Sequence, residues 1–196
     1  MRLIIATDNA GKLSEFCQIL PDPPWQAVSM RQAGFTGQIT EDGADYLENA
    51  LIKARSVHRV TGGLVLADDS GLSIDVLDGA PGLHSARFAG ETAGYPEKIA
   101  RLHQWLQPYP APSWTAHFIC ALAAVFPDGS AETVLRQVDG RIAPEPHGEG
   151  GFGYDPIFFL PERGLTMAEL PEDEKNRISH RGMALRALAQ LLLDRL

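Results

Sequence analysis

The sequence lacks most of the features that mark secreted, membrane-spanning or zinc-dependent proteins. It has two cysteines in 196 residues, Cys17 and Cys120, which we interpret as reduced thiols rather than as a disulfide. No apolar run is long enough to span a membrane, and no signal-peptide pattern opens the chain. His84, His103 and His117 lack the spacing of zinc ligands, so we interpret them as structural. These absences predict a cytoplasmic protein with no membrane partner.

Basic side chains are also scarce. There are 17 Lys and Arg residues against 25 Asp and Glu residues, which gives a net charge of −8. Because phosphate polymers bind basic surfaces, we expect no nucleic-acid polymer as a partner, whereas a small phosphate ligand needs only a local basic cluster and usually a metal. The chain is 44% hydrophobic and 21% charged, which is typical of a globular protein. The length fits one domain over residues 1–196, or one domain with two lobes.

Apolar periodicity and turn residues predict an alternation of strands and helices. The patterns predict strands at residues 3–6, 26–30, 64–67, 72–77, 114–126, 132–138 and 156–160, and helices at residues 13–20, 45–60, 97–106 and 183–196. The turn at residues 127–130 joins two of these strands into a hairpin. Strand–helix order at the front and a long hairpin in the middle favour an α/β fold with a mixed sheet.

A loop of small polar residues, Thr7-Asp8-Asn9-Ala10-Gly11-Lys12, lies between the first predicted strand and helix. Free backbone N–H groups and the positive end of a helix make such a loop a good anion site. The loop is not a Walker-type phosphate loop, because the glycine and the Ser or Thr of that pattern are missing. A solvated lysine at a helix start is the alternative interpretation of Lys12.

Two acidic pairs are the main candidates for metal binding. Asp68 and Asp69 follow the buried strand at residues 64–67, where adjacent carboxylates repel each other unless a cation compensates them. The alternative is an ordinary turn with two solvated aspartates. Glu41 and Asp42 precede the second predicted helix, and we interpret them either as a solvated helix approach or as the other side of a metal site.

Two further segments carry polar or aromatic groups. The glycine-rich segment at residues 150–156 includes Phe152 and Tyr154, which suits a flat ring lying close to the backbone, although core aromatics are the alternative. Lys175, His180 and Arg181 lie in a charged segment before the last predicted helix. A charged turn is the bland interpretation, whereas cations at a helix start favour an anionic or carbonyl-bearing ligand.

Read in order, these motifs resemble the inosine triphosphate pyrophosphatase family, which hydrolyses non-canonical purine nucleoside triphosphates. The resemblance covers almost the whole chain and is carried by Thr7-x-Asn9-x-x-Lys12, Ala67-Asp68-Asp69-Ser70-Gly71-Leu72, Gly79-Ala80-Pro81-Gly82 with Ser85-Ala86-Arg87-Phe88-Ala89-Gly90, Gly150-Gly151-Phe152-Gly153-Tyr154-Asp155-Pro156, and Ser179-His180-Arg181-Gly182.

The resemblance implies an elongated mixed sheet, two α/β lobes with a central substrate cleft, a homodimer, and Mg2+ as cofactor. It implies that ITP, dITP or XTP is converted to the monophosphate and pyrophosphate. Asp69 is the implied catalytic base and metal ligand, and we assign Glu41 as the second metal ligand. The implied substrate contacts are Thr7, Asp8, Asn9, Ala10, Gly11, Lys12, Ser70, Phe152, Gly153, Tyr154, Asp155, Lys175, His180 and Arg181.

The chain departs from the family pattern at two positions, and two other functions stay open. Thr40 stands where the family often has a glutamate, and His84 where it often has a tyrosine. One alternative function is a non-catalytic sensor of purine nucleotides, which the presence of Asp68, Asp69 and Glu41 disfavours. The other is a pyrophosphatase for other nucleotides, such as modified pyrimidines.

Overall fold

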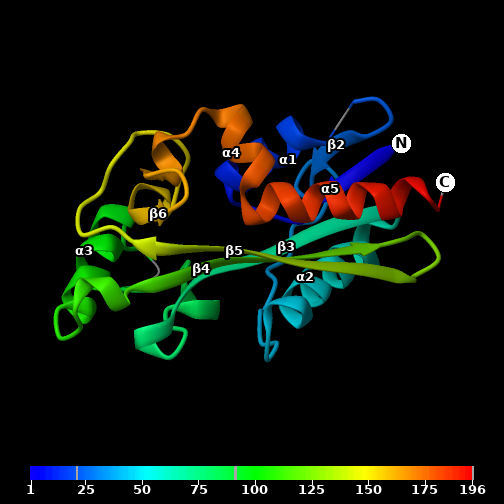
Figure 1. The fold of residues 1–196 in the computed structure, drawn as a ribbon. Helices are drawn as coiled ribbons and strands as arrows, with labels where there is room; N and C mark the ends of the chain where they lie inside the picture. Colours follow the sequence, from blue (N-terminus) through cyan, green and yellow to red (C-terminus); the bar gives the residue numbers. More distant parts are fainter. Residues whose placement is uncertain (21, 91, 196) are drawn as a thin grey trace. The chain divides into compact units, whose positions relative to one another are not determined.

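Figure 1 shows the computed structural model of the protein, which describes residues 1–20, 22–90 and 92–195. Within these residues seven strands form one sheet in the order β2-β1-β3-β4-β5-β6-β7. The strands are β1 (Arg2–Ile5), β2 (Gln26–Ser29), β3 (Leu64–Ile74), β4 (Thr115–Val125), β5 (Ala131–Ile142), β6 (Phe158–Leu160) and β7 (Leu165–Thr166). Strand β1 pairs in parallel with β2 and β3, whereas β6 pairs antiparallel with β5 and β7. The predicted α/β class with a mixed sheet is confirmed.

The chain divides into two compact units, each built from segments that are distant in the sequence. Unit 1 contains Met1–Asp69, Cys120–Arg136 and the chain from Arg181 onward, and unit 2 contains Ser70–Ile119 and Gln137–His180. Strands β3, β4 and β5 contribute residues to both units. The helices are α1 (Ala10–Ile19), α2 (Tyr46–Thr61), α3 (Tyr95–Leu106), α4 (Glu172–Ile178) and α5 (His180–Leu193).

Unit 1 buries both faces of its strands. Successive strand residues point to opposite faces, so β1 and β3 each supply two apolar rows. One row packs with α1 and α5, in a cluster that includes Leu3, Ile5, Leu64, Leu66, Phe16, Leu185 and Leu188. The other row packs with α2, in a cluster that includes Ile4, Ala6, Val65, Ala67, Ala50, Ala54 and Val57. Figure 1 accordingly shows α2 on the opposite side of these strands from α1 and α5.

Unit 2 has its own apolar core. It joins the second half of β3 and the start of β4 to α3 and β6, through side chains that include Leu72, Ile74, Ile99, Leu102, Leu106, Phe118 and Phe158. The rings of Phe118 and Phe158 stack with centroids 4.1 Å apart. Each unit can therefore hold its polar groups on a scaffold of buried side chains.

The predicted hairpin between β4 and β5 is confirmed. The two strands are neighbours in the sheet, and the Ser130 carbonyl accepts a hydrogen bond from the Phe126 N–H (2.9 Å). Asp128 fixes the turn, because its Oδ1 accepts from the Ser130 N–H (2.9 Å). Helix α2 also follows the prediction, with Asp45 as its N-cap.

One local prediction and one alternative interpretation are wrong. The expected break at Asp68 and Asp69 does not exist, since β3 runs without interruption from Leu64 to Ile74. The charged segment before the last helix is not a solvated turn, since it forms α4 and buries Lys175. In both places, buried charges bonded to distant partners overrule what the local sequence favours.

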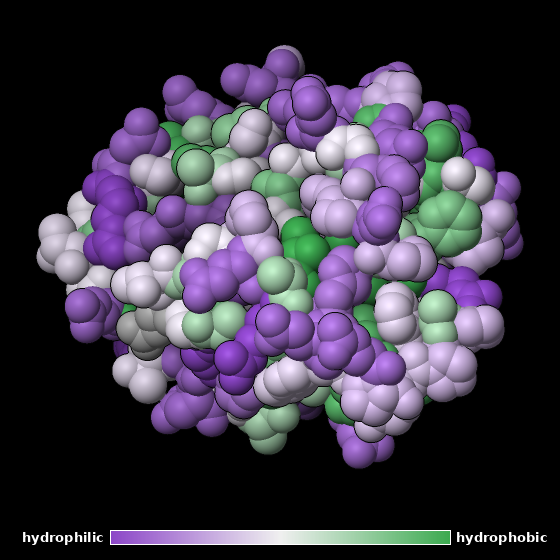
Figure 2. Space-filling model, turned by 90° about the vertical axis from the view of Figure 1, so that its left-hand side faces the viewer, coloured by the Kyte–Doolittle hydropathy of each residue, from purple (hydrophilic) through white to green (hydrophobic). Residues whose placement is uncertain are grey.

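No helix of the described residues is both long and apolar enough to cross a membrane. On the face shown in Figure 2, green apolar side chains are scattered among purple hydrophilic ones. Exposed large apolar residues include Val60, Trp105, Tyr109 and Leu135. Singly exposed apolar side chains of this kind are normal for a folded protein.

Candidate active site

The loop between β1 and α1 is fixed by its own side chains. Asn9 is the N-cap of α1, and its Oδ1 accepts a hydrogen bond from the Lys12 N–H (3.0 Å). Thr7 Oγ1 accepts from the Asn9 N–H (3.1 Å). These bonds orient the first turn of the helix, which contains Ala10 and Gly11. Its N–H groups are the donors that the sequence predicts for a phosphate.

The side chains of Asp8 and Lys12, both in this loop, pair with different partners. Asp8 forms an exposed bidentate pair with Arg31, with nitrogen–oxygen distances of 2.9 and 2.6 Å. The Lys12 ammonium instead forms an ion pair with the buried carboxylate of Asp68. The interpretation of Lys12 as a solvated lysine is therefore wrong.

Asp68 is the centre of a buried cluster of charges in unit 1. Its side chain is 0% exposed and pairs with Lys12 and with Arg181, whose Nε lies 3.1 Å from Asp68 Oδ2. The Cys120 thiol donates to the same Oδ2 (3.6 Å). Arg181 also pairs through Nη1 with the buried Glu15 (2.5 Å). Two of the Arg181 donors are thus committed to carboxylates of its own unit.

Asp69 belongs to a second cluster, on the α2 side of β3. Its Oδ1 accepts from the ammonium of Lys53 (2.9 Å), and its Oδ2 accepts from the Asn49 amide (3.3 Å). Lys53 also donates to Glu41 Oε2 (3.0 Å). The structure therefore brings together Asp69 and Glu41, the two predicted metal ligands, around one lysine.

The two aspartates differ in acidity. Burial acts to raise the pKa of Asp68, but the charges of Lys12 and Arg181 outweigh it and hold that pKa well below its usual range. For Asp69 burial is again the largest influence, and it raises the pKa above the usual value although Lys53 opposes it. A carboxylate with a raised pKa is the better proton acceptor. Of the two, Asp69 is suited to act as a base.

Glu41 is held in place by the segment that follows it. The Gly43 N–H donates to Asn49 Oδ1 (2.9 Å), so the Asn49 amide joins this segment to Asp69. A Cβ at Gly43 would lie 2.8 Å from the Glu48 Cβ and 2.9 Å from the Asn49 backbone nitrogen, so only glycine fits this approach. The segment is therefore bonded to the first turns of α2 and packed closely against them.

The sequence analysis missed three residues of these clusters: Glu15, Asn49 and Lys53. Asn49 and Lys53 are buried and lie four residues apart on α2, beside its apolar face. A lysine and an amide at that spacing in an otherwise apolar stretch were a usable signal. Glu15 offered no such signal, because its partner Arg181 is 166 residues away.

In unit 2, Asp155 links the glycine-rich segment to α4. Its Oδ2 accepts from the Phe152 N–H (2.8 Å) and from the Lys175 ammonium (2.7 Å). That ammonium lies 5.1 Å from the centroid of the Phe152 ring. Gly151 has a φ of +70°, and a Cβ there would lie 2.2 Å from Asp155 Oδ2. The glycine at this position makes room for the ion pair.

The other predicted contacts of unit 2 take different positions. The Tyr154 hydroxyl donates to the Ser85 carbonyl (3.1 Å), and its ring belongs to the apolar core, as the core alternative held. His180 is buried and stacks on Phe118 with centroids 4.8 Å apart. Ser70 is a half-buried residue of β3, and Gly153 adopts a φ of +73°. The predicted substrate contacts of Phe152, Lys175 and His180 stay predictions.

The chemistry of the Glu41 and Asp69 side chains fits Mg2+. Both offer carboxylate oxygens, which are 3.0 and 2.9 Å from the same Lys53 nitrogen. Mg2+ prefers such hard ligands and usually completes its shell with water and substrate phosphates. Among the described residues no group of three or more His, Cys, Asp or Glu side chains could hold a metal. The donor set therefore suits an ion that is bound together with a phosphate.

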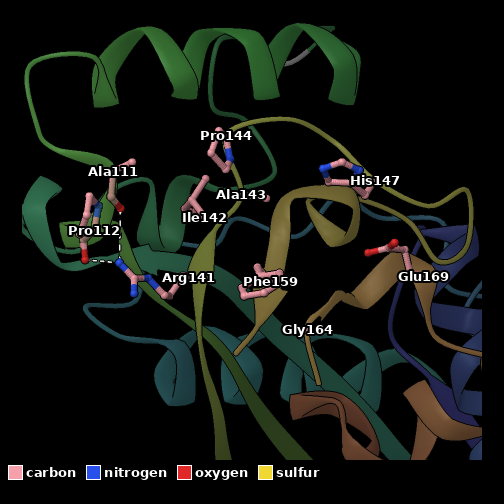
Figure 3. Close-up of a pocket in the computed structure, with 10 residues that line it drawn as sticks. All are labelled: Ala111, Pro112, Arg141, Ile142, Ala143, Pro144, His147, Phe159, Gly164 and Glu169. Atoms are coloured by element: carbon pink, nitrogen blue, oxygen red, sulfur yellow. Dashed lines mark hydrogen bonds between the residues drawn. The ribbon is translucent and has the colours of Figure 1, made fainter. Parts of the chain in front are cut away.

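Unit 2 also contains a separate pocket with a volume of about 510 Å³, and Figure 3 shows the residues that line it. It is lined by Ala111, Pro112, Arg141, Ile142, Ala143, Pro144, His147, Phe159, Gly164 and Glu169, and includes none of the predicted site residues. The Arg141 guanidinium donates to backbone carbonyls at its edge, and Glu169 accepts from the Thr166 N–H (2.7 Å). Because these polar groups already bond the protein's own backbone, we assign this pocket no role.

Comparison with known proteins identifies the family. The Ham1 family model matches residues 3–191 of the chain. The chain belongs to the Ham1 family. This confirms the family resemblance, which rests on five motifs spread along the sequence.

The Ham1 relatives cover nearly the whole chain. The chain is 48% identical over 189 residues to the dITP/XTP pyrophosphatase of Bacillus subtilis, covering 96% of each protein. It is 46% identical over 187 residues to that of Geobacter sulfurreducens, covering 95% of this chain and 94% of the relative. The solved structure of a HAM1 protein from Coxiella burnetii matches with a TM-score of 0.90 at 38% identity, over 99% of each chain.

Proposed function

We propose that this protein hydrolyses dITP, XTP and ITP to the nucleoside monophosphate and pyrophosphate, which removes non-canonical purines from the nucleotide pool. The observation that carries the proposal is the buried Asp69 carboxylate, with a raised pKa, held by Lys53 and Asn49 beside Glu41. The names of the Ham1 relatives at 48% and 46% identity support the substrate class.

The chemistry follows from these groups. Asp69 takes a proton from a water molecule, and the water oxygen forms a bond to the α-phosphorus while the bond from that phosphorus to the bridging oxygen breaks. Pyrophosphate leaves with that oxygen, so no covalent enzyme intermediate is needed. Lys53 and the N–H groups at the start of α1 offset the charge of the phosphates. Mg2+, held by Asp69 and Glu41, would withdraw further charge from the triphosphate.

Base selectivity belongs to the residues of unit 2. Hypoxanthine and xanthine carry an acceptor oxygen at the 6 position, where adenine carries an amino donor. The His180 ring is fixed by stacking on Phe118, so its N–H can distinguish the two groups. A buried polar mismatch of this kind discriminates by roughly 10⁴. Phe152 and Lys175 supply a ring and a charge for the rest of the nucleotide.

The test is a panel of triphosphates with Mg2+, assayed separately for pyrophosphate and orthophosphate. We expect pyrophosphate from dITP, XTP and ITP, little turnover of dATP, and loss of activity in chelator. Pyrophosphate release from modified pyrimidine nucleotides alone would favour the alternative function, a pyrophosphatase for other nucleotides. Binding of dITP without release would favour the sensor, and orthophosphate as the first product would contradict attack at the α-phosphorus.

Assembly and location are part of the same proposal. The family resemblance implies a homodimer, and the sequence predicts a cytoplasmic location; light scattering on the purified protein tests the dimer. A mass near twice 21.3 kDa is the expected result.

A further inference from the structure

Tyr46 has a hydroxyl that the fold itself does not use. Its ring packs against the apolar cluster between α2 and the sheet. Its hydroxyl oxygen is buried and has no hydrogen-bond partner among the residues that the structure describes. A buried hydroxyl without a partner is costly, and phenylalanine would fill almost the same volume without that cost. A ligand or a water molecule could supply the hydrogen bond that the described residues do not provide.

Tyr46 lies on the face of α2 that holds Asp69. Asn49 and Lys53 follow it by three and seven positions, a spacing that places the three side chains in one row along the helix. Asn49 and Lys53 both donate to the Asp69 carboxylate. Tyr46 extends that row by one turn toward the N-terminus of the helix, the end to which the Glu41–Gly43 segment is bonded.

The charge of Asp69 acts on this hydroxyl. Burial, and after it the charge of Asp69, raises the pKa of Tyr46 to about 12. Both groups lie on the α2 side of the sheet, and no direct hydrogen bond joins them among the described residues. At neutral pH the hydroxyl keeps its proton, so it is available as a hydrogen-bonding group and not as a base.

We propose that the Tyr46 hydroxyl and the Asp69 carboxylate together bind the water molecule that attacks the substrate. The inference rests on the proposed function and deepens it. The water donates one hydrogen to Asp69 and the other to Tyr46 Oη, which leaves an oxygen lone pair directed at the α-phosphorus. As the new oxygen–phosphorus bond forms and the bond to pyrophosphate breaks, the proton passes to Asp69, and Tyr46 keeps its own hydrogen.

The test replaces Tyr46 with phenylalanine, which removes one oxygen atom. We expect the kcat for dITP to fall about tenfold, because one hydrogen bond to the attacking water is lost. The KM should change by less than about twofold, because the substrate itself loses no contact. The melting temperature should stay the same or rise, because a costly buried hydroxyl is gone. Tyr109→Phe is the matched control, since Tyr109 is exposed and outside the site.

The outcomes separate this inference from the proposed function. If the wild-type protein releases no pyrophosphate from dITP or XTP, the proposed function fails before any variant is compared. If the wild type is active, a kcat of Tyr46→Phe close to that of wild type overturns the role of Tyr46 alone. A fall in kcat that comes with a lower melting temperature, or an effect on KM only, also overturns it, because both indicate a structural role.

Discussion

Asp68 and Asp69 are adjacent in β3, yet they meet opposite surroundings on the two faces of the sheet. Asp68 is enclosed with Lys12 and Arg181, and its pKa is held well below the usual range because these charges outweigh burial. The Asp69 side chain is 9% exposed and shares Lys53 with Glu41, and burial raises its pKa. The same type of side chain thus has a lowered pKa on one face of the sheet and a raised pKa on the other.

The strand itself explains this separation. Neighbouring residues of a strand point to opposite faces, so two adjacent carboxylates need not repel each other across a shared space. The sequence analysis expected a shared acidic site, which a metal would relieve. In the structure each carboxylate has its own cationic partners, and Asp69 shares Lys53 with Glu41, the other predicted metal ligand.

The largest expected effect comes from Asp69→Asn. An amide of the same shape cannot accept the proton, so we expect pyrophosphate release from dITP to fall by about 10³-fold or more. The melting temperature should change little, because burial disfavours the Asp69 charge and Glu41 still neutralises Lys53. Activity and thermal unfolding measured on one preparation check both statements.

Asp78→Asn is the control for this variant. Asp78 is exposed in unit 2 and has a φ of +50°, a conformation that asparagine also adopts. The Asp78→Asn variant should show the same pyrophosphate release and the same melting temperature as wild type. Near-normal turnover by Asp69→Asn would remove the catalytic distinction between the two aspartates.

Asp68→Asn should show the opposite behaviour. Removing one member of a buried ion pair leaves charges without compensation, at a cost of about 3 kcal/mol. Glu15 still neutralises Arg181, which keeps the cost at the lower end for such changes. For a chain of this size the melting temperature should fall by about 9 °C. At 20 °C the variant should keep far more activity than Asp69→Asn, and equal loss in both would break the comparison.

Much of the fold was predictable because burial imposes periodicity. The apolar rows of β1, α2 and β4 appear in the sequence at the spacing that their faces require. Strand β3 was cut short in the prediction because Asp, Ser and Gly are turn residues. It continues because Arg181, 113 residues from Asp68, compensates the buried charge. No local pattern contains that contact.

The residues of the candidate site also differ in whether the sequence alone could predict them. Lys12 and Asp69 could be found from short motifs, since each stands at a recognisable junction. The burial of Lys175 could not, because it depends on Asp155 in another segment, 20 residues away. Tyr46, Asn49 and Lys53 lie on a helix whose apolar face the prediction found, although the polar row beside that face was not interpreted.

A third cluster of charges, in unit 2, extends the comparison to a less enclosed setting. His117 lies on β4 between two aspartates, with Nδ1 2.7 Å from Asp139 and Nε2 3.0 Å from Asp75. Thr115 also donates to Asp75, and Gln137 donates to Asp139 (2.6 Å). Both ring nitrogens can donate to carboxylates only when the ring is protonated. This histidine therefore favours its charged form, although both aspartates are largely exposed.

The smallest expected effect comes from His117→Gln, and it depends on pH. Burial acts to lower the pKa of His117, but the bonds to Asp139 and Asp75 outweigh it and raise that pKa above its usual value. A raised pKa means stabilisation that is complete below about pH 6.5 and is lost as the pH rises through the folded-state pKa. Wild type should therefore melt about 2 °C above His117→Gln at pH 5.5, and the gap should close by about pH 9. His58→Gln is the control, because the His58 ring contacts the Gly63 carbonyl instead of a carboxylate. A gap that is constant with pH would show that His117 acts through packing, and the contrast between enclosed and exposed charge clusters would then rest on Asp68 and Asp69 alone.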